Sequence, residues 1–417
     1  MVKYEYLMIL EVFNMSRLER LKMGKVLPQH LKQYNELLRY VFQVTNKELQ
    51  QVGWEAREIA LAKLPVLQQA DVLGWFEGEK LVSQLSVYPF QVNIFGKTFE
   101  MGGLTGVGTY PEYANMGLMY KLMIQALEDM RNRKQSISYL YPYSFPFYRR
   151  RGWEIISDKM TFEVKDYQLP QAKKVTGYVE RLNTEHPDVR TVYNRFSSEQ
   201  HAAMIRNELA WDEYWRWDLD ELTAAVYYDV SNHPQGYVLY WISADVLHIK
   251  EMIYMNQEAR NGLWNFISAH FSMVTRVVGN VYTDEPLAFW LEDGDIKETI
   301  APYYMARIID AKQFIDQYPF RAIGTETEIT FELDDPMVDW NKGIFTLHVS
   351  TTGQGELNPS EKEPSASFDI QTLTTMLMNY KRPSYLAEIG RLNCDKGTVK
   401  KWEDLIERET PYFSDYF

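Results

Sequence analysis

The sequence has very few groups that could cross-link the chain or hold a metal ion. It contains one cysteine, Cys394, in 417 residues. A disulfide within the chain needs two cysteines, so none is expected, and a cysteine-based metal site is excluded for the same reason. The seven histidines form no His-Glu-x-x-His pattern or similar cluster. We therefore expect neither a disulfide nor a bound metal.

Long apolar runs are also missing, and none reaches the roughly 18 residues that predict a membrane span. The chain begins MVKYEYLMILEVFNMS, where Glu5 and Glu11 interrupt a short apolar piece and no small-residue cleavage site follows. We interpret residues 1–14 as an extension ahead of Met15, and the sequence leaves open whether translation starts at Met1 or Met15. The resulting expectation is a cytoplasmic protein without a membrane partner.

Positive charge is scarce as well. The chain has 57 acidic and 44 basic residues, which gives a net charge of −13. This balance argues against nucleic acid as a partner and suits a cationic ligand such as a polyamine. An acidic surface that only keeps the protein in solution explains the charge equally well. With 46% hydrophobic residues the chain is globular, and its length predicts about three domains.

Residues 101–131 form the most informative stretch. Residues 104–110 are typical of a buried strand, Pro111 ends it, and a loop over 112–116 leads to a helix that starts near Gly117. The first free N–H groups of a helix attract an anion, and a glycine there lets a phosphate approach the backbone. An ordinary connection from strand to helix is the alternative interpretation.

This stretch resembles motif A of the GNAT acetyltransferases, which transfer an acetyl group from acetyl-CoA to an amine. The family pattern is V-x-V-x-P followed by x-x-R-x-x-G-L/I; here Val107 to Pro111 reads VGTYP and Glu112 to Leu118 reads EYANMGL. Ala114 replaces the first arginine of the pattern, which removes a cation near the pyrophosphate. The resemblance implies acetyl-CoA as co-substrate. It places the pantetheine arm at Val107, Gly108 and Thr109. It places the pyrophosphate at Asn115, Met116, Gly117, Leu118, Met119 and Tyr120. It places the acetyl end at Tyr143 and Ser144.

A second element, Phe147 to Trp153, reads FYRRRGW and resembles the end of GNAT domains, where a tyrosine lies beside the thioester sulfur. Tyr148 falls on that tyrosine. The three consecutive arginines are either a solvated turn or a set of contacts to the phosphates of CoA.

The order of the remaining segments predicts an α/β (α+β) protein of several domains. A helix within 28–50, two hairpins over 71–101 with turns at 77–80 and 93–97, and a closing strand at 159–164 complete a GNAT domain at 15–165. Helical patterns at 190–196 and 197–207, then strands, predict a second GNAT-like domain at 166–300 that lacks motif A; an unrelated α/β domain is the alternative. Residues 301–417 have the element order of the sterol carrier protein fold.

These three units in this order resemble the Eis (enhanced intracellular survival) N-acetyltransferases, from about Met15 onward. The resemblance implies Tyr148 as general acid and the terminal carboxylate of Phe417 as general base. A carboxylate at a chain end has a pKa of about 3.3–3.7 in water, and burial makes it more basic. The aromatic ending TPYFSDYF favours a docked chain end over a frayed one.

The same resemblance implies an acceptor with several amines, such as an aminoglycoside, and a homohexamer. A protein lysine or a small polyamine remains open as the acceptor. The competing hypothesis is a lipid-binding or other hydrophobic-ligand-binding protein that uses the sterol-carrier-like domain and has an inactive GNAT domain, because Ala114 departs from the motif.

Overall fold

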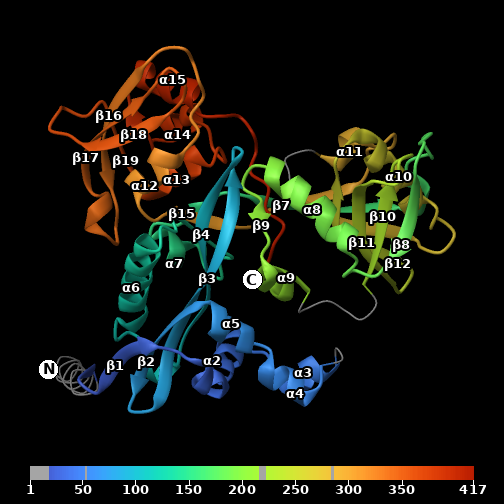
Figure 1. The fold of residues 1–417 in the computed structure, drawn as a ribbon, viewed down its shortest axis with the longest axis horizontal. Coiled ribbons are helices and arrows are strands. Elements are labelled where there is room, and N and C mark those ends of the chain that lie inside the picture. Colours follow the sequence, from blue (N-terminus) through green and yellow to red (C-terminus); the bar gives the residue numbers. More distant parts are fainter. Residues whose placement is uncertain (1–17, 52–53, 216–221, 283–285) are drawn as a thin grey trace, which may run out of the picture.

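A computed structural model describes residues 18–51, 54–215, 222–282 and 286–417. The predicted extension over residues 1–14 lies outside this part of the chain. Within it, three sheets with their covering helices form three units, and the C-terminal end lies between them (Figure 1).

The first sheet carries the GNAT motif found in the sequence. In spatial order its main strands are β1 (Leu21–Lys25), β2 (Asp71–Glu77), β3 (Lys80–Ile94), β4 (Lys97–Thr109), β5 (Ile137–Leu140), β15 (Met305–Ile308) and β6 (Glu154–Ile155). The helices of this unit are η1 (Pro28–His30), α2 (Leu31–Phe42), α3 (Asn46–Gln51), α4 (Ala56–Leu61), α5 (Leu64–Gln69), η2 (Pro111–Tyr113), α6 (Leu118–Asn132) and α7 (Phe145–Arg149). The predicted hairpins and the strand, loop and helix of motif A are confirmed.

The second sheet belongs to the GNAT-like unit. Its order is β14 (Lys297–Pro302), β7 (Asp158–Lys165), β13 (Arg276–Val281), β12 (Val246–Tyr254), β11 (Pro234–Ser243), β10 (Thr223–Tyr228) and β8 (Tyr178–Leu182). Its helices are η3 (Asp166–Gln168), α8 (Pro187–Glu199), α9 (Glu208–Trp215), α10 (Gln257–Ser268) and α11 (Leu287–Trp290). The helix predicted over 197–207 is wrong: α8 ends at Glu199, and the short strand β9 (Met204–Ile205) pairs with β3.

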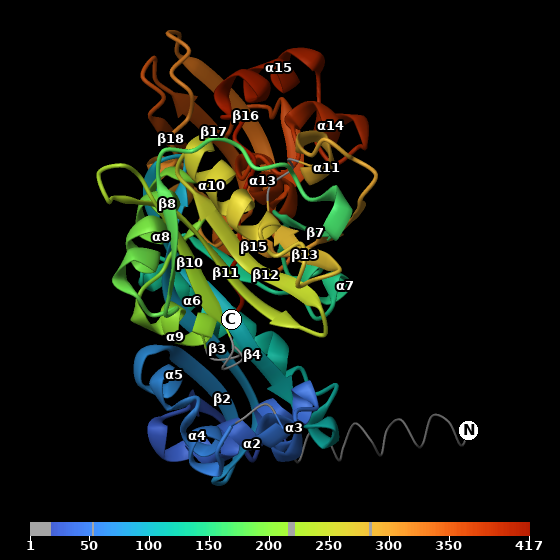
Figure 2. The same ribbon diagram turned by 90° about the vertical axis from the view of Figure 1, so that its right-hand side faces the viewer.

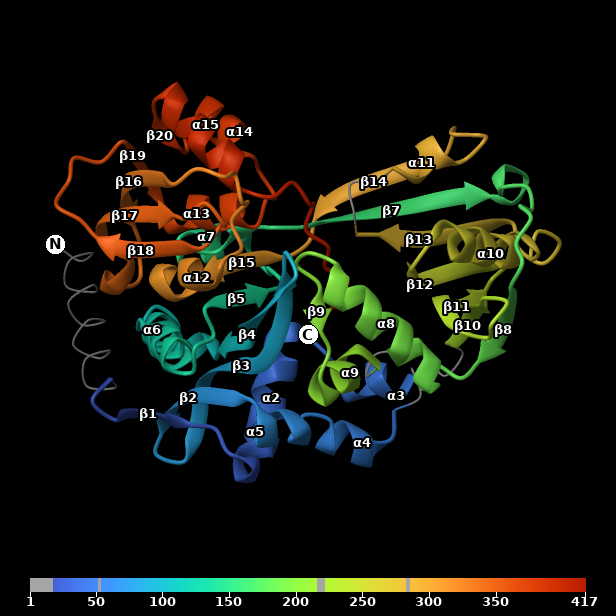
Figure 3. The same ribbon diagram turned by 45° about the horizontal axis from the view of Figure 1, so that its top comes forward.

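The two GNAT units exchange strands, which the sequence did not predict. The strand at 159–164 was expected to close the first unit, but it forms part of β7 and pairs with β13 and β14 of the second sheet. Conversely, β15 follows the second unit in the chain and pairs with β5 and β6 of the first. Figure 3 shows β7 and β14 running together from the centre of the molecule toward the second sheet. Strand pairing of this kind fixes the two units against each other.

The third unit contains the sheet β18 (Gly355–Pro359), β17 (Gly343–Val349), β16 (Thr327–Asp334), β19 (Ala366–Asp369) and β20 (Asn393–Cys394). Around it lie α12 (Ala311–Gln317), η4 (Asp339–Asn341), α13 (Ile370–Leu377), α14 (Pro383–Glu388) and α15 (Lys396–Leu405). Phe331, Phe368 and Trp402 pack together in its interior, with ring centroids 4.9 to 6.1 Å apart. Figure 2 shows this unit at the opposite end of the molecule from α2 to α5.

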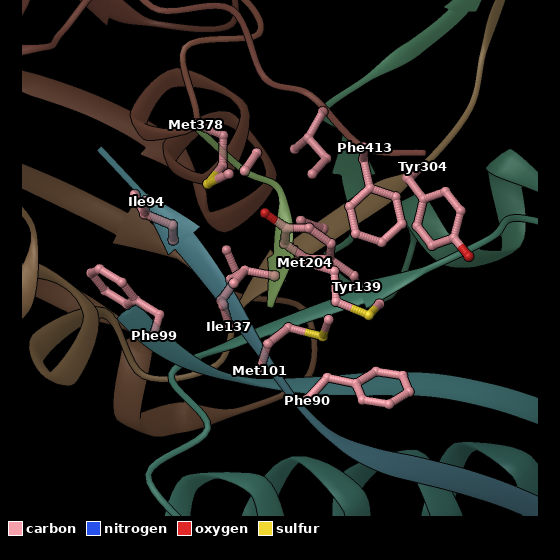
Figure 4. Close-up of a cluster of buried hydrophobic side chains, with 14 of the residues drawn as sticks. Phe90, Ile94, Phe99, Met101, Ile137, Tyr139, Met204, Tyr304, Met378 and Phe413 are labelled. Atoms are coloured by element: carbon pink, nitrogen blue, oxygen red, sulfur yellow. The ribbon is translucent and has the colours of Figure 1, made fainter. Parts of the chain in front are cut away.

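One apolar core joins the three units. It combines Phe90 and Met101 of the first sheet with Met204 of β9 and Met378 and Phe413 from the third unit (Figure 4). In the described part of the chain, no helix is both long and apolar enough to cross a lipid bilayer.

Candidate active site

Strands β4 and β5 lie side by side over only a few residues and then separate. Their parallel pairing runs from Met101 with Ile137 to Gly103 with Tyr139. Beyond this point β4 continues to Thr109, paired with β3 along its other edge. Gly106 has a φ of +63° at the place where the pairing of β3 and β4 shifts register, which is typical of a bulge with a left-handed glycine. The edge of β4 over residues 104–109 therefore faces the gap between the two strands.

The loop after β4 leads directly into the N-terminus of α6. Gly117 precedes the helix with a φ of +72°, and Asn115 also has a positive φ, of +61°. A Cβ at Gly117 would meet no atom within 4 Å, so the space beside this residue is open. Helix N-termini present unsatisfied N–H groups and partial positive charge. This geometry fits a phosphate group held by backbone amides.

The residues predicted around the pyrophosphate divide into two groups. Asn115, Gly117 and Tyr120 are exposed, and Met119 is half-buried. Met116 and Leu118 have buried side chains that pack in the core beneath the loop. Only their backbone amides can therefore face an anion. Ala114, which replaces the motif arginine, is exposed and removes no internal contact.

The residues predicted along the pantetheine arm have packing roles as well. A Cβ on Gly108 would lie 2.8 Å from Cγ2 of Val41, so this glycine allows α2 to pack closely on β4. The hydroxyls of Thr109 and Ser83 are hydrogen-bonded at 2.7 Å. Val107 is half-buried against the first core. Together with the unpaired edge and the open loop, these positions fit a CoA molecule that is held mainly by backbone groups.

Tyr148 lies on α7, which follows β5 on the far side of the gap. Its ring packs edge-on against Phe147 and Trp153, with centroids 5.0 and 6.3 Å away. Burial raises the pKa of Tyr148 to about 12, and the charge of Arg151 offsets part of that rise. The phenol is therefore protonated at neutral pH and can donate a proton. Ser144 is the residue that precedes α7, and Tyr143 is 83% exposed.

The arginine run has mostly structural contacts. Arg149 makes a bidentate ion pair with the buried carboxylate of Glu154, at 2.8 to 3.2 Å, and Arg391 of the third unit reaches the same carboxylate at 2.6 Å. Arg151 donates to the carbonyl of Phe147 at 2.8 Å and lies over its ring. Two of the three arginines therefore hold the turn in place, which favours the turn over the phosphate contacts; Arg150 is exposed.

The last residues of the sequence dock against the first sheet. Thr105 Oγ1 of β4 donates to the main-chain oxygen of Phe417 at 3.2 Å, and Phe417 N–H donates to the hydroxyl of Tyr304 at 3.3 Å. The Phe417 ring packs against Phe90, with centroids 5.1 Å apart, and a Cβ on Gly103 would clash with that ring. The expected docking of the aromatic chain end is confirmed.

A buried ion network in the second unit holds the segment that leads to Phe417. Arg206 binds Asp415 at 2.7 Å and Glu251 at 2.9 Å, and the side chains of all three are at most 4% exposed. Ser414 donates to Glu251 at 2.7 Å, and Tyr303 donates to the main-chain oxygen of Asp415 at 2.9 Å. No local sequence pattern indicates this network, because its members are 45 to 209 positions apart in the chain.

Tyr148 and Phe417 are associated with the two strands that flank the gap. Phe417 contacts β4 through Gly103 and Thr105, while Tyr148 follows the end of β5. Among the described contacts, no hydrogen bond or ring contact joins the two residues directly.

A cavity of about 470 Å³ opens beside this chain end. The C-terminal segment contributes Ser414 and Tyr416, and the residue after β5, Tyr141, packs on Tyr416 with ring centroids 5.2 Å apart. The rest of the lining comes mainly from the second unit. Its volume lies in the range of small-molecule sites. A larger cavity of about 630 Å³ lies between the ends of β12 and β13. Phe417 lines neither cavity, but its neighbour Tyr416 lines the smaller one only, which makes that cavity the better candidate for an acceptor.

In the described part of the chain, no group of three or more His, Cys, Asp or Glu side chains is arranged so that it could bind a metal ion.

Known protein families match the three units separately. The acetyltransferase (GNAT) domain matches residues 25–156, a second acetyltransferase (GNAT) domain matches 202–308, and the sterol carrier protein domain matches 311–414. An uncharacterized N-acetyltransferase of Streptomyces avermitilis is 22% identical over 392 residues, which are 87% of this chain and 91% of that protein.

Several solved structures have the same architecture. A probable N-acyltransferase of Enterococcus faecalis, a conserved protein of unknown function, superposes with a TM-score of 0.86 at 26% identity, covering 95% of this chain and 99% of its own. A GCN5-related N-acetyltransferase of Anabaena variabilis gives 0.82 at 20% identity, covering 95% and 100%. Eis1 of Mycobacterium abscessus gives 0.77 at 16% identity, with the same coverage.

Fold and site together define a protein of two GNAT domains followed by a sterol-carrier-protein domain, as the sequence predicted. The two GNAT domains identify the protein as an N-acetyltransferase, and GNAT acetyltransferases use acetyl-CoA.

Proposed function

We propose that the protein is an Eis-type enzyme that acetylates an amine of a small molecule, with Tyr148 as general acid and the terminal carboxylate of Phe417 as general base. The observation that carries this proposal is the docking of Phe417 at Thr105, beside the gap between β4 and β5. A chain end held by hydrogen bonds and a buried ring has a defined position, which a frayed end lacks.

The protein groups divide the work as follows. The loop from Asn115 to Gly117 and the first turn of α6 hold the pyrophosphate, and the edge of β4 holds the pantetheine arm. Acetyl-CoA supplies a thioester carbonyl that an amine can attack. The carboxylate of Phe417 accepts a proton from the amine, and the Tyr148 hydroxyl protonates the departing thiolate.

The acceptor implied by the family resemblance is a multi-amine such as an aminoglycoside, which the acidic net charge suits. This remains a prediction, and the cavity gives it little support. Its acidic lining residue, Glu213, is paired with Lys63 at 2.5 Å, and two lysines, Lys159 and Lys250, line the same cavity. The homohexamer and the cytoplasmic location also remain predictions.

The competing hypothesis of a hydrophobic-ligand carrier depends on space inside the third unit. The packing of Phe331 and Phe368 against Trp402 fills the interior next to β16 and β19 with the protein's own side chains. No feature of this unit favours a bound lipid over packed side chains, so we prefer the enzymatic function.

The test measures thiol release from acetyl-CoA with a panel of amines, on the protein as given and on a variant extended by four alanines after Phe417. A variant with the same four residues added before Met1 is the matched control. We expect activity in the protein and in the control, and its loss in the extended variant, whose thermal unfolding should be unchanged. Activity that survives the extension would place the base elsewhere. Absence of acetyl-CoA binding by calorimetry would contradict the enzymatic function altogether.

A further inference from the structure

Lys159 is a cation in the wall of the candidate acceptor cavity. It lies on β7, the strand that the second sheet takes from the middle of the chain, and its side chain lines the 470 Å³ cavity beside Tyr416. Its ammonium lies 5.6 Å from the ring centre of Tyr303 and 5.9 Å from that of Tyr282. These are near the upper limit for an attraction between a cation and an aromatic ring.

No carboxylate balances this charge. Among the described residues, none makes an ion pair or a hydrogen bond with the Lys159 ammonium, and the side chain is half-buried. Burial lowers the pKa of Lys159, with no acidic neighbour to offset the effect. Charged groups in such positions are normally paired. The missing partner is therefore best explained by a ligand.

The other charged residues of the cavity have contacts that the protein supplies. Glu213 is bound by Lys63 at 2.5 Å. Lys250 donates to the main-chain oxygen of Tyr214 at 2.9 Å and lies 4.0 Å from the centre of that ring. Lys159 differs from both, because its contacts among the described residues are with the aromatic rings of Tyr282 and Tyr303 and include no hydrogen bond or ion pair.

Most of the remaining lining is aromatic. Flat side chains stack on flat ligands and exclude water from a nearby ion pair. Six of them line the cavity: Tyr141, Tyr214, Trp241, Tyr282, Tyr303 and Tyr416.

We propose that the acceptor is an amine that carries both an aromatic ring and a carboxylate, and that Lys159 binds this carboxylate. A single ammonium balances the single charge of a carboxylate, whereas a phosphate monoester carries nearly two. The inference rests on the proposed function, since the amine of the same molecule must reach the chain end at Phe417. A polycation would instead place like charges against Lys159.

The arrangement also suits the chemistry. With the carboxylate at Lys159, the amine has to reach the part of the cavity lined by Tyr416, which precedes Phe417 in the chain. Only the neutral amine attacks a thioester, so the proposed base at Phe417 has to accept its proton. In the transfer the acetyl–sulfur bond breaks and an acetyl–nitrogen bond forms; the amine loses one proton and the thiolate gains one.

The experiment compares L-tryptophan with tryptamine, which has the same ring and amine but no carboxylate. Both are tested with the wild-type protein and with Lys159→Met, Lys159→Arg and Lys297→Met. Lys297 is the matched control, because it is exposed on β14, the strand next to β7 in the same sheet. Thiol release gives kcat/KM, and calorimetry gives binding without turnover.

We expect the wild-type protein to prefer L-tryptophan over tryptamine by at least tenfold in kcat/KM. Lys159→Met should abolish that preference by lowering the value for L-tryptophan alone, Lys159→Arg should retain much of it, and Lys297→Met should behave as wild type. Binding of L-tryptophan that Lys159→Met weakens tenfold supports the carboxylate site even without turnover, in which case only the enzymatic proposal fails.

Two outcomes overturn the inference. One is that the wild-type protein has equal kcat/KM values for L-tryptophan and tryptamine, or a higher value for the multi-amine kanamycin. The enzymatic function would then stand, and the carboxylate site would not. The other is a loss in Lys159→Met that is the same for both amines, because a structural role would produce it. Absence of L-tryptophan binding also counts against the site.

Discussion

The hydroxyl of Thr105 donates a hydrogen bond to the main-chain oxygen of Phe417, although 312 positions separate the two residues. This contact joins the strand that carries the GNAT motif to the last residue of the third unit. The first sheet and the C-terminal end of the chain therefore meet at this hydrogen bond.

Replacing Thr105 by valine keeps the shape of the side chain and removes the donor to Phe417. A hydrogen bond of this type contributes about 1 kcal/mol, or more if the acceptor is charged, so we expect kcat/KM to fall roughly five- to tenfold. The thiol-release assay measures this effect. Thr98→Val, at an exposed position on the same strand, should leave activity unchanged. Equal activity in both variants would show that this hydrogen bond does not position the chain end.

Tyr148→Phe removes the hydroxyl that is proposed to protonate the thiolate. General acid catalysis typically contributes about 10²- to 10⁴-fold, so kcat should fall by that order while acetyl-CoA binding measured by calorimetry stays the same.

Because the pKa of Tyr148 is raised to about 12, the acid form persists across the neutral and moderately alkaline range. Wild-type activity should therefore show no loss from Tyr148 ionisation below about pH 11. A decline centred near pH 10 that Tyr148→Phe abolishes would contradict the raised pKa.

Two glycines with left-handed backbones should respond differently to alanine. A Cβ at Gly152 would lie 1.4 Å from Nη1 of Arg307 and displace that side chain, whose Nη2 makes a buried ion pair with Asp335 at 2.6 Å. Gly152→Ala should therefore lower the free energy of unfolding by about 3 kcal/mol or more. A Cβ at Gly117 meets no atom, so Gly117→Ala should cost only about 1–2 kcal/mol from its φ of +72°.

Chemical denaturation measures both changes, and Gly117→Ala should also raise the KM for acetyl-CoA, because the new methyl group occupies the open space before α6. An unchanged KM would mean that no phosphate approaches this residue closely.

Arg206→Met leaves Glu251 and Asp415 buried without their cation. Removing one member of a buried ion network costs about 3–5 kcal/mol, so the midpoint of urea unfolding should fall markedly. Arg195→Met, at an exposed position on α8, should change stability by no more than about 0.5 kcal/mol. Similar stability of the two variants would mean that the network is not required for folding.

Asp415 makes stability depend on pH. Burial raises the pKa of Asp415 in the folded protein, with Arg206 opposing the rise and Glu251 adding to it. A raised pKa means that the contribution of this carboxyl to stability is complete below the unfolded value of about 3.9 and is lost as the pH rises through the folded value. Asp415→Asn lacks this loss. The difference in free energy of unfolding, variant minus wild type, should therefore increase as the pH rises above about 4. A difference that is flat or decreases in urea titrations at several pH values would contradict the direction of the shift.

The motif residues were predictable from the sequence because they are contiguous. A strand, a proline, a short loop and a glycine before an amphipathic helix appear within residues 104–130, and local backbone preferences are enough to produce them. The same holds for the hairpin turns at 77–80 and 93–97. Family resemblance extended this local pattern to the order of the three domains, and the apolar ending of the chain predicted that Phe417 docks.

The tertiary structure decided what depends on distant partners. Strands β7 and β15 have the same local pattern as any buried strand, so the sequence pattern does not say which sheet each joins. In the fold β7 pairs in the second sheet and β15 pairs in the first. Arg206, Glu251 and Asp415 would each be solvated in an unfolded chain, and they are stable inside the protein only because folding brings all three together. Lys159 is likewise an ordinary strand lysine in the sequence. Only the fold places its ammonium among aromatic rings in a cavity wall without a carboxylate partner.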